Sequence, residues 1–263
     1  MPRLPRLAHQ WNVIPGEAVG EPGRSLRIHS RVGHDNGGGK PAVILVPGLV
    51  VTSRNVMRTA RPLQDRFSVY GLDLPGFGPS DNPRRAASVP GLAAALFAWM
   101  DAAGLPDAHL LGNSFGCQVI AEAAVQQPGR VRSLILTGPA LDPAIRRFWQ
   151  PVWRLVADAC VEPLLVPPTL YDFFETGLPR VVGIYFSCLR DRIEKKLPRI
   201  AQRTLLVRGE RDLICRAPWL ERMAGLLAGP VEARTIPRAP HAVVYSAPEA
   251  TARLAAEFIG TGP

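Results

Sequence analysis

A serine between two glycines is the first group in this chain whose setting fits nucleophilic chemistry. Ser114 is the centre of a Gly-x-Ser-x-Gly pattern bounded by Gly112 and Gly116, with apolar residues before it and a helix-like run after it. Glycine at these two positions removes side chains that would collide in a sharp turn between a strand and a helix. Such a turn exposes the hydroxyl and sets a backbone N–H beside it for an oxyanion. We therefore predict Ser114 as a nucleophile, provided that a base and an acid accompany it.

The base must be a histidine within hydrogen-bond reach of the serine, and the chain has five histidines. Four of them lie in the N-terminal segments or in the strand before the serine: His9, His29, His34 and His109. His241 instead lies in a loop after the last expected strand. We therefore predict His241 as the general base.

The acid that orients this base should lie just beyond the carboxyl end of a strand, where open α/β sheets place their sites. Asp212 lies there, a few residues after the apolar run 204–207. Glu210 is a close competitor, and Asp142 follows the preceding strand in the same way. Asp212 is the favoured acid, and the chain order becomes Ser114, Asp212, His241.

The elements that would carry these residues alternate between strands and helices. We expect two N-terminal strands at 11–19 and 24–32, joined through a turn, and then six apolar strands: Ala42–Val46, Ser68–Leu72, His109–Leu111, Val131–Thr137, Thr204–Val207 and Val231–Ile236. Helical segments lie between them, among them Ser88–Ala103, Phe115–Gln127, Ala217–Leu227 and Ala247–Ile259. This alternation predicts an α/β protein with a mostly parallel sheet covered on both faces.

The interval 139–201 interrupts the alternation with a cluster of aromatic residues and prolines. Two interpretations are open: a few extra helices with a small core of their own, or a helical lid whose inner face lines a substrate pocket. Its position between a strand and the strand that carries Asp212 favours the lid. On that interpretation we predict substrate contacts from Phe148, Trp149 and Trp153, the two tryptophans lying four residues apart on one helix face.

With these motifs in place, the chain resembles the α/β-hydrolase fold superfamily from about Val43 to Phe258. The resemblance rests on the elbow around Ser114, on the acid and histidine segments, and on two loops, Val46-Pro47-Gly48-Leu49 and Asp73-Leu74-Pro75-Gly76-Phe77-Gly78-Pro79-Ser80. It implies an eight-stranded, mostly parallel sheet flanked by helices, with a small lid inserted after the sixth strand. The implied core domain spans 1–138 and 202–263, and the implied lid spans 139–201.

The same resemblance implies an oxyanion hole built from the backbone N–H groups of Phe115 and Leu49. This chain has Pro47 where the family usually has a histidine, so a side chain that normally braces the loop is missing. Val50 is the alternative donor, and we also predict it as a substrate contact. The segment from Asp73 to Ser80 is predicted to be structural.

The leading functional prediction is a serine hydrolase that cleaves a carboxylic ester or thioester of an apolar small molecule. The elbow also resembles that of the carbon–carbon bond hydrolases that cleave meta-cleavage products, in which lid arginines could bind a substrate carboxylate; the candidates here are Arg146, Arg147, Arg190 and Arg192. A third possibility is a non-catalytic binding protein of the same fold.

Composition limits the remaining classes. The chain has 263 residues, 47% of them hydrophobic and 20% charged, and a net charge of +9 spread over arginines rather than gathered in a basic tract. We expect a small-molecule substrate, no nucleic-acid or membrane partner, and a monomer or homodimer. The four cysteines lack metal-ligand spacing, so we expect no metal and no cofactor. The absence of an apolar run after the first residues predicts a cytoplasmic protein.

Overall fold

One mostly parallel sheet organises the computed structural model, which describes residues 8–33, 39–145 and 149–261. Within these ranges eight strands are ordered β1-β2-β4-β3-β5-β6-β7-β8. The pairs β1–β2 and β2–β4 are antiparallel and all others are parallel, which confirms the predicted fold class. The strands are β1 (Ala8–Pro15), β2 (Ser25–Val32), β3 (Ala42–Val46), β4 (Ser68–Leu72), β5 (Ala108–Asn113), β6 (Val131–Thr137), β7 (Thr204–Gly209) and β8 (Val231–Ile236).

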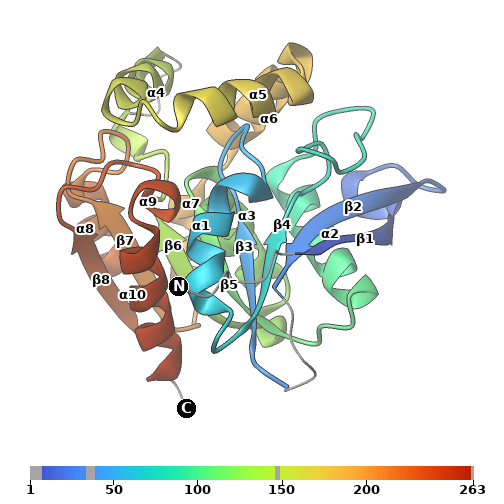
Figure 1. The fold of residues 1–263 in the computed structure, drawn as a ribbon, viewed down its shortest axis with the longest axis horizontal. Helices are drawn as coiled ribbons and strands as arrows, with labels where there is room; N and C mark the ends of the chain where they lie inside the picture. Colours follow the sequence, from blue (N-terminus) through green and yellow to red (C-terminus); the bar gives the residue numbers. More distant parts are fainter. Residues whose placement is uncertain (1–7, 34–38, 146–148, 262–263) are drawn as a thin grey trace.

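Helices cover both faces of the sheet, because its central strands are apolar on both sides. One face packs against α1, α9 and α10, and the other against α2, α3 and α8 (Figure 1). The covering helices are α1 (Ser53–Leu63), α2 (Val89–Ala102), α3 (Phe115–Gln126), α8 (Ala217–Leu226), α9 (Val243–Ser246) and α10 (Pro248–Gly260). The site therefore stands at the carboxyl edge of a sheet that is rigidly packed on both sides.

In the described part of the chain between β6 and β7 lie four further α-helices: α4 (Trp149–Val161), α5 (Val166–Thr176), α6 (Leu178–Arg190) and α7 (Ile193–Lys196). We refer to α4–α6 as the inserted helices. They lie beyond the carboxyl ends of the parallel strands, at the top of Figure 1, while α7 packs below them against the sheet core.

The inserted helices are tied to the core through a buried carboxylate on α5. Asp172 Oδ2 accepts hydrogen bonds from the backbone N–H of Thr52 at 3.0 Å and from Asn55 Nδ2 at 2.9 Å. Asp172 Oδ1 accepts from Arg54 Nη1 at 3.1 Å. Asp172, which is 120 positions further along the chain than Thr52, thus ties α5 to the beginning of α1.

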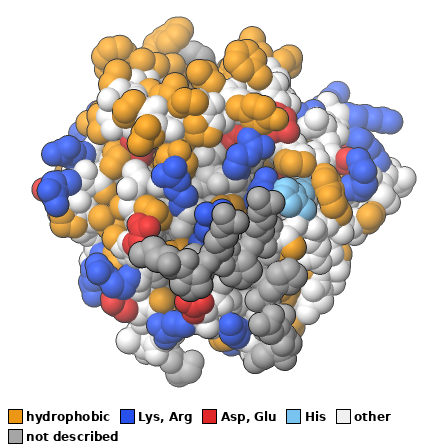
Figure 2. All heavy atoms as spheres, viewed as in Figure 1, with side chains coloured by type: hydrophobic (Ala, Val, Ile, Leu, Met, Phe, Trp, Pro, Cys, Tyr) orange, Lys and Arg blue, Asp and Glu red, His pale blue; other side chains and the backbone are white. Residues whose placement is uncertain are grey.

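The outer surface of the inserted helices is unusually apolar. Figure 2 shows hydrophobic side chains gathered over this part of the molecule. The most exposed are Trp149, Trp153, Leu164, Phe174 and Leu178, each at least 61% exposed. In the ranges that the structure describes, none of the helices combines the length and apolarity needed to cross a membrane.

Two elements differ from the sequence prediction. The first strand was expected at 11–19, but β1 ends at Pro15, and Gly16–Val19 forms a 3-10 turn because Gly16 N–H donates to Arg24 O and closes the hairpin early. Helix α1 was not predicted, since three arginines and Pro62 obscure its pattern. Its buried stripe was nevertheless readable at helical spacing: Val56, Met57, Ala60 and Leu63.

Candidate active site

Ser114 occupies the turn between β5 and α3 in a conformation that few residues adopt. Its backbone has φ 53° and ψ −115°, outside the comfortable regions for a side chain-bearing residue. The flanking glycines make the turn possible. A Cβ at Gly116 would lie 2.3 Å from Val46 O, and one at Gly112 would lie 2.8 Å from the Gly116 backbone. The turn leaves Ser114 half-buried, with its hydroxyl at the edge of a cavity.

His241 lies across the same cavity and is held by Asp212. His241 Nδ1 is 2.9 Å and 3.0 Å from the two carboxylate oxygens of Asp212, so this nitrogen carries the donated proton. Asp212 is itself fixed, because its Oδ1 accepts from the backbone N–H of Ile214 at 2.8 Å and of Cys215 at 2.7 Å. His241 Nε2 is buried and makes no hydrogen bond with any described residue. That nitrogen is the position from which a base would act on the serine hydroxyl.

The other candidate acids and bases are engaged elsewhere. Asp142 accepts from Arg216 Nη2 at 2.9 Å, and Glu210 accepts from the backbone N–H of Arg238 at 2.7 Å. Among the histidines, His29 Nδ1 lies 2.6 Å from Asp73, and His109 Nδ1 lies 2.7 Å from the Ser133 hydroxyl; His9 bonds to His29, and His34 lies outside the described residues. The structure therefore brings together Ser114, His241 and Asp212 and leaves the alternatives apart.

Electrostatics favour the protonated form of His241. Burial alone lowers the pKa of His241, but the charge of Asp212 and its hydrogen bond outweigh burial. The charges of Asp158 and Glu162 act in the same direction, and together these groups raise the pKa to about 9. The same negative charges would stabilise the imidazolium that forms when His241 Nε2 accepts a proton.

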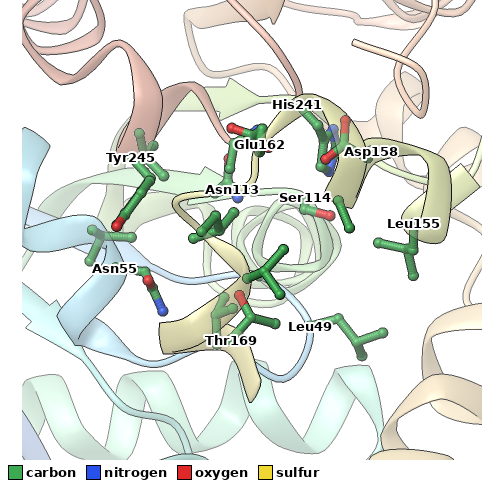
Figure 3. Close-up of a pocket in the computed structure, with 18 of the residues that line it drawn as sticks. Leu49, Asn55, Asn113, Ser114, Leu155, Asp158, Glu162, Thr169, His241 and Tyr245 are labelled. Atoms are coloured by element: carbon green, nitrogen blue, oxygen red, sulfur yellow. The ribbon is translucent and has the colours of Figure 1, made fainter. Parts of the chain in front are cut away.

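The cavity that contains Ser114 and His241 has a volume of about 240 Å³ (Figure 3). One side, which we name the sheet wall, is built from loops at the ends of β3, β5 and β8 together with α1 and α9: Gly48, Leu49, Val51, Asn55, Val56, Asn113, Ser114, His241, Ala242, Val244 and Tyr245. The other side, the helix wall, comes from α4, α5 and the turn between them: Leu155, Asp158, Ala159, Glu162, Leu165, Val166, Thr169 and Leu170. Most of these side chains are apolar.

The predicted oxyanion loop lies directly against the serine. A Cβ at Gly48 would be 3.3 Å from Ser114 Cβ, so the loop after β3 passes at van der Waals distance from the nucleophile. Leu49 lines the cavity, whereas Val50 is buried and does not. Val50 has a φ of 59°, which is strained for a β-branched residue and turns the loop sharply at this point. Phe115 is the first residue of α3, and its N–H has no partner within the helix.

The predicted substrate contacts of the insertion are placed differently. Phe148 lies outside the described residues. Trp149 and Trp153 are 75% and 70% exposed and do not line the cavity. The reason is the helical period: the face of α4 that points to Ser114 carries Leu155 and Asp158, and the two tryptophans lie on the opposite face.

Several cavity residues were not anticipated from the sequence, among them the polar residues Asp158, Glu162, Thr169 and Tyr245. Asp158 and Glu162 had a readable signal, since two acids four residues apart at the end of a mostly apolar helix share one face. Thr169 and Tyr245 had none, because nothing in their local sequence indicates which loop or helix faces the cavity.

Comparisons with known proteins agree with this architecture. A family model described as alpha/beta hydrolase fold matches residues 41–165. The chain is 26% identical over 244 residues to the pimeloyl-[acyl-carrier protein] methyl ester esterase of Nitrosospira multiformis, covering 80% of this chain and 90% of that protein. It is also similar to a solved membrane phospholipase A, with a TM-score of 0.79 and 25% identity over 97% of this chain and 86% of that one.

A third relative matches a smaller part. The dihydrolipoyllysine-residue acetyltransferase component of the acetoin cleaving system of Cupriavidus necator is 35% identical over 103 residues, and the chain covers only 28% of its length. The sheet order, the elbow and the family model together show that the chain has the α/β-hydrolase fold.

Proposed function

We propose that this protein is a serine hydrolase that cleaves a carboxylic ester or thioester of an apolar small molecule. One observation carries the proposal. His241 is anchored by Asp212 through Nδ1, while its Nε2 is buried beside the cavity that Ser114 also lines. Acyl transfer requires a nucleophile, a base that an acid holds through one nitrogen, and a cavity beside them for the substrate.

The chemistry then follows from the placement of these groups. His241 Nε2 accepts the Ser114 hydroxyl proton as Oγ attacks the acyl carbon, and the resulting imidazolium is stabilised by Asp212. The same imidazolium gives its proton to the departing alcohol or thiol, which leaves an acyl-enzyme. Water, deprotonated by His241, attacks the acyl carbon; the acid is released and Ser114 regains its proton.

The oxyanion formed in each half-reaction is assigned to the N–H groups of Phe115 and Leu49. Two features support this assignment: Phe115 stands at the beginning of α3, and the loop that carries Leu49 passes against Ser114. Both donors belong to the backbone, so Pro47 in place of the usual histidine does not remove either of them. Loss of one such donor costs about 10²–10³ in rate.

The composition of the cavity supports an apolar substrate. Leu49 and Val51 on the sheet wall face Leu155 and Leu170 on the helix wall. The decisive experiment is hydrolysis of p-nitrophenyl esters by the wild type and by Ser114→Ala. We expect Ser114→Ala to lose roughly 10⁴–10⁶ in kcat. Full turnover by that variant would overturn the proposal.

The carbon–carbon hydrolase alternative has less support. It requires a cation to bind a substrate carboxylate, yet Arg190 stacks on Phe186 and Arg192 lies 3.8 Å from Glu194, and neither lines the cavity. Arg146 and Arg147 lie outside the described residues. A dienoate that turned over faster than simple esters would favour this alternative. A folded protein with an unreactive Ser114 would favour a binding protein.

A further inference from the structure

Two carboxyl groups of the helix wall lie beside His241. Asp158 and Glu162 come one turn apart at the end of α4, and both line the cavity (Figure 3). They are only 6% and 5% exposed. Buried acids are uncommon unless a partner stabilises them, so each of these needs an explanation.

Glu162 is explained by the hydrogen bonds that it accepts. Its Oε2 accepts from the backbone N–H of Ala242 at 3.0 Å, and its Oε1 accepts from the Ser246 hydroxyl at 2.6 Å. Glu162 therefore ties the end of α4 to the segment that carries His241, and its two oxygens have partners within the protein. Its role is to hold the helix wall and the base together.

Asp158 accepts no comparable hydrogen bonds from the backbone or from a hydroxyl, and its side-chain hydrogen bond is with the Glu162 carboxyl. Its Oδ1 is buried and has no N–H or hydroxyl donor among the residues that the structure describes. A buried carboxyl oxygen without a donor destabilises the folded state, and proteins rarely keep one without a use. Because Asp158 lines the cavity, a donor on a bound molecule can satisfy it.

The charges around Asp158 restrict what that donor can be. The titratable groups that act on it are His241 before α9, Glu162 just past the end of α4 and Asp212 after β7. Burial, reinforced by the two neighbouring acids and opposed by His241, raises the pKa of Asp158 to about 7. The remaining titratable side chain of the cavity, Tyr245, donates its hydroxyl to Leu164 O at 3.1 Å.

No arginine or lysine occurs among the described residues that line this cavity. Its one cationic group is the His241 imidazolium, whose charge is already balanced by Asp212. A substrate carboxylate would therefore face Asp158 and Glu162 without a cation of its own to pair with, which is unfavourable in a buried site. A hydroxyl or a protonated amine would instead find an acceptor.

We propose that Asp158 is a specificity-determining residue of this cavity, and that the substrate carries a hydrogen-bond donor, a hydroxyl or a protonated amine, on an otherwise apolar group. This inference rests on the proposed hydrolase function and narrows its substrate class. On this inference, Ser114 and His241 on the sheet wall carry out the reaction, and Asp158 on the helix wall selects the substrate.

The test compares four p-nitrophenyl esters: hexanoate and its analogues that end in a hydroxyl, an ammonium or a carboxylate group. We expect the wild type to prefer the hydroxyl and ammonium esters over hexanoate by at least about tenfold in kcat/KM, since one charge-assisted hydrogen bond is worth about that much, and to cleave the carboxylate ester most slowly. Asp158→Leu should abolish both preferences, and Asp158→Asn should abolish only the preference for ammonium. Glu175→Gln, which changes a carboxylate of α5 outside the cavity, is the matched control.

Binding separates failure of this inference from failure of the proposed function. In Ser114→Ala the four esters remain intact, so their Kd values rank recognition without turnover. If the wild type cleaves hexanoate but shows no preference, or if Asp158→Leu keeps the preference, the inference is wrong and the hydrolase function stands. If the wild type cleaves none of the esters, the proposed function is wrong. Equal Kd values for all four esters would then overturn the inference about Asp158 as well. Tighter binding of the hydroxyl and ammonium esters would support that inference.

Discussion

The two walls of the cavity are built on different principles. On the sheet wall, Ser114 and His241 stand on short loops that follow buried parallel strands, and backbone contacts fix those loops closely. On the helix wall, α4 and α5 come from a long insertion with an apolar outer face, held to the core by carboxylates such as Glu162 and Asp172. The sheet edge thus holds the residues proposed for the chemistry, while the inserted helices hold the residue proposed to select the substrate.

The largest expected effect lies on the sheet wall. Asp212→Asn should lower kcat by about 10⁴, because the amide cannot hold His241 in the tautomer that leaves Nε2 as an acceptor. Asp142→Asn is the matched control, since Asp142 bonds to Arg216 and should leave kcat within about tenfold. Steady-state hydrolysis of a p-nitrophenyl ester measures both variants. Equal losses of kcat in the two variants would contradict the choice of Asp212 over Asp142 as the acid that orients His241.

The elbow around Ser114 is also sensitive to a single added methyl group. Gly116→Ala places a methyl group 2.3 Å from Val46 O and should push the loop that leads to Leu49. We expect activity to fall about 10²-fold from misplacement of the oxyanion donor, and stability to fall by about 1–3 kcal/mol. Gly225→Ala in α8, where a Cβ meets nothing within 4 Å, should be neutral or slightly stabilising. Thermal unfolding and ester turnover test both changes.

The pH dependence of kcat/KM tests whether Asp158 on the helix wall raises the pKa of His241. Because the pKa of His241 is raised to about 9, the imidazole is protonated at neutral pH, and kcat/KM should rise about tenfold per pH unit until it levels off near that value. Asp158→Asn removes one charge that raises this pKa, so its ascending limb should move to lower pH, while that of Glu175→Gln should not move. A limb unchanged in Asp158→Asn would show that the helix wall does not act on the base.

The raised pKa of His241 also makes the folded protein less stable at high pH. The pKa of His241 is higher in the folded protein than the usual 6.5, so its favourable contribution is fully present below about pH 6.5 and is lost as pH rises through about 9. Denaturant unfolding at pH 6, 8 and 10 should show this loss in the wild type and a smaller one in His241→Ala. A wild-type loss no larger than that of the variant would contradict the assigned pKa.

The smallest effect should come from the outer face of the inserted helices. Trp153→Ala should change kcat/KM for soluble esters by less than about twofold and stability by less than about 0.5 kcal/mol, because the side chain is 70% exposed and away from the cavity. Leu155→Ala, on the inner face of the same helix, should raise KM several-fold. A larger change in kcat/KM from Trp153→Ala than from Leu155→Ala would show that the opposite face of α4 points to the cavity.

The sequence predicted the sheet wall better than the helix wall for a physical reason. Ser114, Asp212 and His241 each follow a strand with a clear apolar pattern, and parallel strands bring their carboxyl ends together. The face that α4 presents depends on where a long insertion docks, and helical spacing shows which residues share a face but not which face points to the cavity. Trp149 and Trp153 share one face, Asp158 and Glu162 share another, and the prediction chose the wrong one.

The central claim is that Ser114 is a nucleophile activated by His241. Intact-mass measurement after treatment with a fluorophosphonate tests it most directly, because the reagent traps an activated serine without requiring the natural substrate. We predict one adduct on the wild type, none on Ser114→Ala, and labelling slowed by orders of magnitude in His241→Ala. A folded wild type that takes up no label, or a Ser114→Ala variant that is labelled equally well, would contradict the claim.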